Sequence, residues 1–333
     1  MNSFRAIVVF GFTLSTSAFG YSDPAGLVNL VKNTCPSTVL EFDGSYGKEY
    51  DLLTPRFAFD DSRMVSVMES ADTRQIKIHI KKTDGSKSDR LLPLFEYKRI
   101  LLIGDSIWFL QDNKLVEYNI NQNQITGEYP SYTRPFEVKL STRARGFAYS
   151  NGYIYIAHGE FGVVLFDVKA KKPYTVINAG LMNDSLAGAV EIKGDSLYVL
   201  QGAYSPIGFN GLSIYDLKSG WTKTIGYPPS MGVVDPYTST MKANDDYLFV
   251  NNSGWIHAFD LKALATAPKT LAPVWISVVE NIATDGGNFQ KFLMVNGDLV
   301  INQRDVVACS SISYTPVGKR RPVTEFRTIY KPY

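Results

Sequence analysis

The sequence predicts an all-β fold, a six-bladed β-propeller built from four-stranded antiparallel blades. A short phrase recurs through the chain, in which a turn of Gly, Asn or Asp is followed by an apolar and aromatic run. Successive copies are 43, 47, 43, 51 and 51 residues apart, a period typical of propeller blades. The units lack the helical spacing of apolar residues, which favours several short strands in each. The fourth residues of the six copies are Met64, Ile107, Ile154, Leu197, Leu248 and Leu299.

The recurring phrase predicts a β-hairpin in each unit. Asn-Gly and Gly-Asp turns between apolar runs need a positive φ at a central position, which Gly, Asn and Asp tolerate best. Around Asn151 and Gly152, residues 146–149 lead into the turn and residues 153–157 lead out of it. Both runs are rich in aromatic and β-branched residues, as strands prefer. We expect them to be the two inner strands of a blade.

A second phrase follows the hairpin and predicts the third strand of a blade. It begins with Gly and has Asp as its third residue from the end at residues 162–169, 211–218 and 254–262, and residues 114–121 carry the same pattern with Lys for Gly and Asn for Asp. This Asp or Asn can bond the backbone two residues on and so end the strand in a turn. Residues 124–129 and 174–178 then supply outer fourth strands. Closing six such sheets into a ring covers their faces and protects their edges.

One stretch also resembles a known repeat family. Residues 155–168 read Tyr-Ile-Ala-His-Gly-Glu-Phe-Gly-Val-Val-Leu-Phe-Asp-Val and resemble an LVIVD-type repeat, and the region from about 54 to 331 is similar to propellers of the LVIVD, NHL and WD40-like kinds. The resemblance implies a blade. His158 and Glu160 depart from the pattern, because an acidic residue and a small one are more usual there. No reaction is implied, since propellers host many functions.

The two ends of the chain predict a three-part organisation. Residues 1–20 resemble a secretory signal, with Arg5, an apolar stretch too short to span a bilayer, and small residues for cleavage. In residues 21–53, Asp23 and Pro24 precede an apolar stripe that predicts a short capped helix, and residues 38–42 and 48–53 read as strands. This segment is expected to pack on the ring formed by residues 54–333. A seventh, composite blade built from both termini is the alternative.

Composition bounds the environment and the partners of the chain. With 34 Lys and Arg against 32 Asp and Glu, the charge balance gives no reason to expect a nucleic-acid partner. We expect an exported monomer, periplasmic or extracellular, with no membrane span. The only two cysteines are Cys35 and Cys309, and an even pair in an exported chain suggests a disulfide that joins the first and last blades. Two buried free thiols are the alternative.

The expected binding site is one face of the ring. Connections between second and third strands, and those that join one blade to the next, emerge at the same end of the sheets; we call this end the loop face. The connections there carry polar residues of both signs. The candidate ligand-binding residues are Arg74, Asp112, Arg145, His158, Glu160, Tyr204, Asn251 and Arg304.

Enzyme signatures are sparse, so the sequence favours a binding or scaffold protein with a protein, peptide or glycan partner, and no catalytic residue or cofactor is assigned. Its three histidines, His79, His158 and His257, have no metal-ligand spacing. His158 could act as a general base or hold a metal with Glu160, although a surface hydrogen-bonding role is favoured. The alternative function is a calcium-dependent hydrolase or lyase, with the ion in the central channel near Asp112, Glu160, Asn251 and Asn302.

Overall fold

The fold was analysed in a computed structural model. It describes residues 26–31, 56–59, 62–70, 73–82, 84–182, 184–204, 208–226, 234, 236, 239–243, 245–252, 255–266, 275–279, 291–295, 298–303, 306–316 and 327–330. In these residues the chain forms antiparallel β-sheets, with one short helix, α2 (Leu261–Thr266), and a 3-10 turn at Leu140–Thr142. The all-β prediction is confirmed, and the fold is propeller-like.

Five of the six sheets in the described part of the chain contain four strands, and in each of these five sheets the strands follow chain order. The first is β2 (Arg56–Phe59), β3 (Arg63–Ser70), β4 (Gln75–Lys82) and β5 (Lys87–Pro93). The second is β6 (Arg99–Ile103), β7 (Ser106–Leu110), β8 (Lys114–Asn119) and β9 (Gln124–Pro130). The third is β10 (Gly146–Ser150), β11 (Tyr153–Ala157), β12 (Val163–Asp167) and β13 (Lys172–Ile177). The fourth is β14 (Ser185–Lys193), β15 (Ser196–Ala203), β16 (Gly211–Asp216) and β17 (Thr222–Gly226). The fifth is β18 (Thr240–Ala243), β19 (Tyr247–Asn252), β20 (Trp255–Asp260) and β21 (Trp275–Val279).

The sixth sheet combines strands from both ends of the chain. Strands β22 (Lys291–Val295), β23 (Asp298–Gln303) and β24 (Val306–Pro316) pair in order, and β24 also pairs with β25 (Arg327–Tyr330) and with β1 (Gly26–Val31). The short helix predicted for this N-terminal stretch is therefore wrong over residues 26–31, because pairing with β24 overrides a weak helical pattern. The composite pairing expected of a seventh blade occurs here within the sixth sheet. The strands predicted at 38–42 and 48–53 lie outside the described residues.

The turns have the geometry that the recurring phrases predict. Asn151 and Gly152 both have positive φ, at 50° and 83°, and join β10 to β11 in register. The third strands end as expected, since the backbone N–H of Lys218 donates to Asp216 Oδ1 at 3.0 Å and that of Ala170 donates to Asp167 Oδ1 at 2.8 Å. Short polar side chains thus end the strands at these turns.

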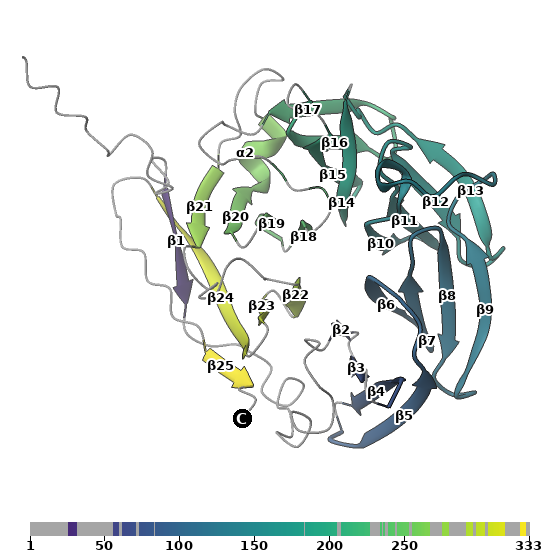
Figure 1. Ribbon diagram of the computed structural model, residues 1–333. Helices are drawn as coiled ribbons and strands as arrows, with labels where there is room; N and C mark the ends of the chain where they lie inside the picture. The colour runs from purple at the N-terminus through teal and green to yellow at the C-terminus, as the bar shows by residue number, and fades with distance from the viewer. Residues whose placement is uncertain are drawn as a thin grey trace, which may run out of the picture.

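The hydrophobic core lies between neighbouring sheets. Adjacent residues of β7 point to opposite faces, so that Phe109 packs with the first sheet and Trp108 packs with Phe166 of the third. Equivalent clusters join the third sheet to the fourth and the fourth to the fifth. Figure 1 shows the sheets arranged about a common centre, with the first strand of each sheet facing inward. This arrangement brings the connections at the loop face close together.

Candidate functional site

The candidate site lies on the loop face, where the second and third sheets meet. A cavity of about 230 Å³ opens between the connection before β6, the turn between β7 and β8, and the long connection from β9 to β10. Each of these segments contributes to its lining, among them Lys98, Asp112 and Val138. The cavity is smaller than the roughly 300–1,000 Å³ of typical small-molecule sites. Its size suits a side chain of a partner better than a whole cofactor.

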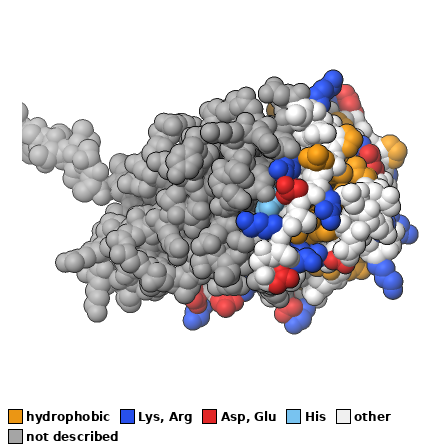
Figure 2. Space-filling view, turned by 90° about the horizontal axis from the view of Figure 1, so that it is seen from below, with side chains coloured by type: hydrophobic (Ala, Val, Ile, Leu, Met, Phe, Trp, Pro, Cys, Tyr) orange, Lys and Arg blue, Asp and Glu red, His pale blue; other side chains and the backbone are white. Residues whose placement is uncertain are grey.

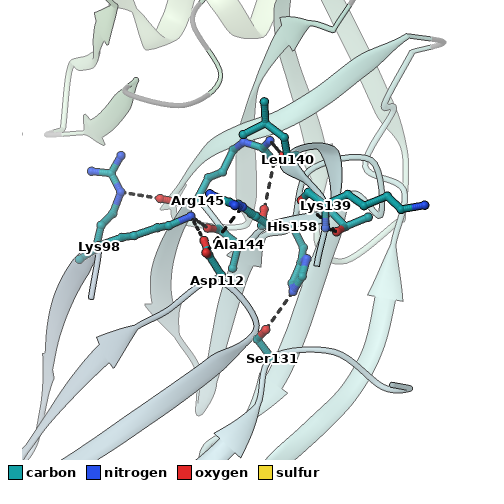
Figure 3. A network of polar contacts seen from close by, with 11 residues as sticks. Lys98, Asp112, Ser131, Lys139, Leu140, Ala144, Arg145 and His158 are labelled. Carbon is teal, nitrogen blue, oxygen red and sulfur yellow. Dashed lines mark hydrogen bonds and ion pairs between the residues drawn. The ribbon is translucent and has the colours of Figure 1, made fainter. Parts of the chain in front are cut away.

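An ion-pair network forms one wall of this cavity (Figure 3). Lys98 pairs with Asp112 and donates to the carbonyl of Ala144 at 3.0 Å. Arg143 Nε lies 3.6 Å from the other carboxylate oxygen of Asp112. Burial lowers the pKa of Lys98, and the neighbouring Arg145 and Arg143 act in the same direction, whereas Asp112 opposes them. Positive charge is therefore concentrated around a single carboxylate.

Arg145 and Arg99 fix the backbone behind this wall. Arg145 is only 2% exposed, and its guanidinium donates to the carbonyls of Arg143, at 3.0 Å, and Leu140. Arg99 donates from Nε to the carbonyl of Arg145 at 2.7 Å and from Nη2 to that of Ser239 at 2.8 Å. Arg99 begins β6, whereas Arg145 and Ser239 directly precede β10 and β18. One guanidinium thus links the starts of three innermost strands.

His158 lies beneath the connection from β9 to β10, and its side chain is 0% exposed. Its Nε2 is 2.9 Å from Ser131 Oγ, and three aromatic rings, those of Tyr132, Phe136 and Phe161, lie against the imidazole. Burial lowers the pKa of His158 to about 4. The expected surface role of His158 is wrong, because the neutral imidazole is part of the core under this connection.

The turn that follows His158 requires a glycine. Gly159 has φ +57°, and a Cβ at this position would lie 1.9 Å from the carbonyl oxygen of Ser141. The next residue, Glu160, donates its backbone N–H to the same carbonyl at 2.9 Å. This close approach holds the turn after β11 against the 3-10 turn, next to the buried His158. Glu160 itself is exposed.

Four of the eight candidate residues gather in this region, namely Asp112, Arg145, His158 and Glu160. Arg74 is exposed in the turn between β3 and β4, and Tyr204 is 57% exposed after β15, so that both lie on the loop face of other sheets. Asn251 lies in β19 with its side chain outside the description, and Arg304 lies outside the described residues.

Sequence reasoning missed Lys98, Arg99 and Ser131. Lys98 directly precedes β6 and Arg99 is its first residue. Two adjacent basic residues before an apolar run were the available signal in the sequence. Ser131 carries no signal of its own, because its role follows from its backbone N–H, which donates to the carbonyl of Asn113 at 2.9 Å, and from its contact with His158.

The described part of the surface carries mixed charges. Figure 2 shows Lys and Arg side chains interspersed with Asp and Glu on the coloured part of that view. Within the described residues, no group of three or more His, Cys, Asp or Glu side chains converges as metal ligands would. No helix in that same part of the chain has the length and apolar character needed to cross a membrane.

Comparisons with known proteins bear on the fold. No protein-family model and no curated protein sequence matches the chain. It is similar to the solved structures of BamB from Moraxella catarrhalis (14% identity, TM-score 0.46, 80% of this chain and 83% of that one) and of the computationally designed Ika8 protein (8%, 0.43, 81% and 98%). It is also similar to U3-55K, with 9% identity, a TM-score of 0.52, and coverage of 81% of this chain and 84% of that one. The likeness to U3-55K, a WD40-like propeller, agrees with a propeller-like, all-β class of protein.

Proposed function

We propose that this protein is an exported, monomeric, six-bladed β-propeller whose loop face binds a protein, peptide or glycan partner. Ring closure is supported by the contacts of β2 with both β6 and β22, and by those of β18 with β22. A closed ring gives a rigid platform on which loops from different blades can present side chains together.

One observation carries the binding role, which is the distribution of exposed apolar side chains. Of the ten large hydrophobic residues that are exposed in the described part of the chain, five lie in connections at the loop face. Contiguous exposed apolar surface is typical of interaction sites, and Val138 and Leu140 lie two residues apart in one connection. It favours a protein or peptide over a glycan. The five residues are Leu94, Val138, Leu140, Met182 and Tyr204.

The role can be tested by capturing partners from the compartment to which the protein is exported. We expect the double variant Val138→Asp with Leu140→Asp to lose a cross-linked partner that the wild type retains, because charge at these positions opposes apolar contact. Tyr174→Asp is the matched control, since Tyr174 is 63% exposed on the outer strand β13, away from the loop face. Equal recovery of the partner by both variants would remove the loop face as the binding surface.

Export and the Cys35–Cys309 bridge belong to the same proposal. The bridge is supported by the register of β1 with β24, in which Val31 is opposite Ser311. Cys35 follows Val31 by four residues and Cys309 precedes Ser311 by two, so in sequence both are close to the Val31–Ser311 end of this antiparallel pairing. The intact mass of the protein, measured with and without reductant, tests both the removal of the signal segment and the bridge. We expect a mature chain that lacks about residues 1–20 and gains the mass of two hydrogen atoms when the reductant converts the disulfide to two thiols; an unchanged mass would refute the bridge.

A further inference from the structure

Positive charge lies beside the cavity at Lys98. Lys98, Asp112 and the exposed Glu96 are the charged residues of its lining, and Arg143 and Arg145 lie next to the Lys98–Asp112 pair, outside the lining. Arg143 Nε is buried and makes no hydrogen bond within the described residues, and its nearest Asp112 oxygen is 3.6 Å away. A guanidinium in this position can donate to a further carboxylate, for which its planar donor geometry is well suited.

The rim of the cavity adds an apolar contact. Val138 lines the cavity and is 37% exposed, and Leu140 in the same connection is 51% exposed. The backbone under this rim is held firmly, because the buried Arg145 guanidinium binds the carbonyl of Leu140 and Thr142 Oγ1 donates to that of Glu137 at 3.0 Å. A ligand would therefore meet a preformed surface with cations on one side and aliphatic side chains on the other.

From this geometry we propose that the cavity receives the carboxylate of an acidic peptide segment of the partner, with a neighbouring apolar residue of that segment on Val138 and Leu140. The proposal rests on the proposed function, since it names the chemistry that the loop face recognises. The lowered pKa of Lys98, caused by burial and by the two arginines, agrees with a need for further negative charge. Binding would weaken as salt is raised, because the cavity is open to solvent.

The test uses the full mature chain and three fluorescent peptides, Ser-Leu-Xaa-Leu-Ser with Xaa as Glu, Gln or Lys. Binding of each peptide is measured by fluorescence polarisation. We expect saturable binding of the Glu peptide and affinity lower by about tenfold for the Gln peptide, the effect of losing one charged hydrogen-bond partner. The Lys peptide should bind more weakly still. Equal affinities for the three peptides, or no saturable binding of the Glu peptide, would overturn the proposal.

Two variants with opposite expected effects make the test specific. Arg143→Gln should weaken binding of the Glu peptide by about tenfold, whereas Asp112→Asn should tighten it, because it removes a carboxylate that competes for the same cations. Arg134→Gln, an exposed arginine in the same connection, is the matched control and should leave affinity unchanged. An equal loss of affinity in Arg143→Gln and Arg134→Gln would indicate a general charge effect and would refute the assignment.

Competition with inorganic phosphate separates the sources of the anion. If phosphate displaces the Glu peptide only at concentrations well above the dissociation constant of the peptide, the result supports recognition of a peptide carboxylate. If phosphate binds as tightly as the peptide, the proposal is overturned. The proposed function can still hold if this inference fails. In that case capture of the partner would depend on Val138 and Leu140 while the three peptides bind alike.

Discussion

His158 shows how a single polar residue can stabilise the loop face without contacting a ligand. Its ring fills the space among Tyr132, Phe136 and Phe161, and its Nε2 contacts Ser131, which in turn is bonded to Asn113 at the cavity. The imidazole therefore supports the connection on which Val138 and Leu140 lie. A buried, neutral histidine has a measurable consequence, because the unfolded chain binds a proton at a pH where the folded chain does not.

The pH dependence of unfolding tests this role. Above pH 6.5 the imidazole is neutral in both states, whereas between 6.5 and about 4 only the unfolded chain is protonated. His158 should thus reduce the free energy of unfolding as pH falls through this range, by about 3 kcal/mol in total at about 1.4 kcal/mol per unit. Urea unfolding of the wild type and His158→Gln at pH 7 and 4.5 measures the difference. A loss of stability of the same size in both proteins would contradict the prediction.

Gly159 gives a second prediction for a single residue. Gly159→Ala places a methyl group against the carbonyl of Ser141 and forces a positive φ on a residue with a side chain, so it should destabilise the protein by roughly 2 kcal/mol or more. Gly104→Ala is the control, since Gly104 has φ +54° but nothing within 4 Å of the added Cβ, and it should cost about 1 kcal/mol. Chemical denaturation measures both values, and equal losses would show that close packing at Gly159 has no effect.

Among the strands, those with a turn signal at each end were predictable from sequence. The strands expected at 124–129 and 174–178 correspond to β9 and β13, because Asn or Asp turns mark where the preceding strands end. Strand β1 was not predictable, since its partner residues in β24 are 280 to 290 positions away and the local pattern also fits a helix. The burial of His158 was also missed, because it depends on contacts with the 131–136 segment that no local pattern encodes.

Packing between sheets predicts the effect of a core substitution in β7. Trp108 is 1% exposed and contacts Tyr129 and Phe166, whose ring belongs to the next sheet. Trp108→Ala should lower the free energy of unfolding by about 3–5 kcal/mol, because it leaves a large cavity between two sheets. Leu91→Ala, at a position 53% exposed on the outer strand β5, should change it by less than about 0.5 kcal/mol. Thermal or urea unfolding compares the two, and similar losses would contradict an inter-sheet core at Trp108.

For the whole molecule, the pairing of β1 with β24 predicts that the N-terminal segment is required for stability. Deleting residues 1–31 removes β1 and leaves residues 311–316 without their partner strand, so the truncated protein should unfold at lower temperature and aggregate more readily. Deleting residues 1–20 keeps β1 and is the control. Scanning calorimetry with light scattering measures both effects. Equal melting temperatures for the two truncated proteins would show that β1 adds nothing to the stability of the ring.

The contacts of Arg99 also affect the order in which the protein can fold. Its guanidinium binds a carbonyl 140 residues later in the chain, and β1 pairs with residues of β24 that lie at least 280 positions later. Such distant contacts form late, and folding dominated by them is slow. As the chain is made, the first sheets can pack on one another, but the starts of β6 and β18 cannot be joined until the fifth sheet has emerged. Completion of the sheets therefore awaits synthesis of β24, and shorter nascent chains expose unpaired strand edges to chaperones or to aggregation.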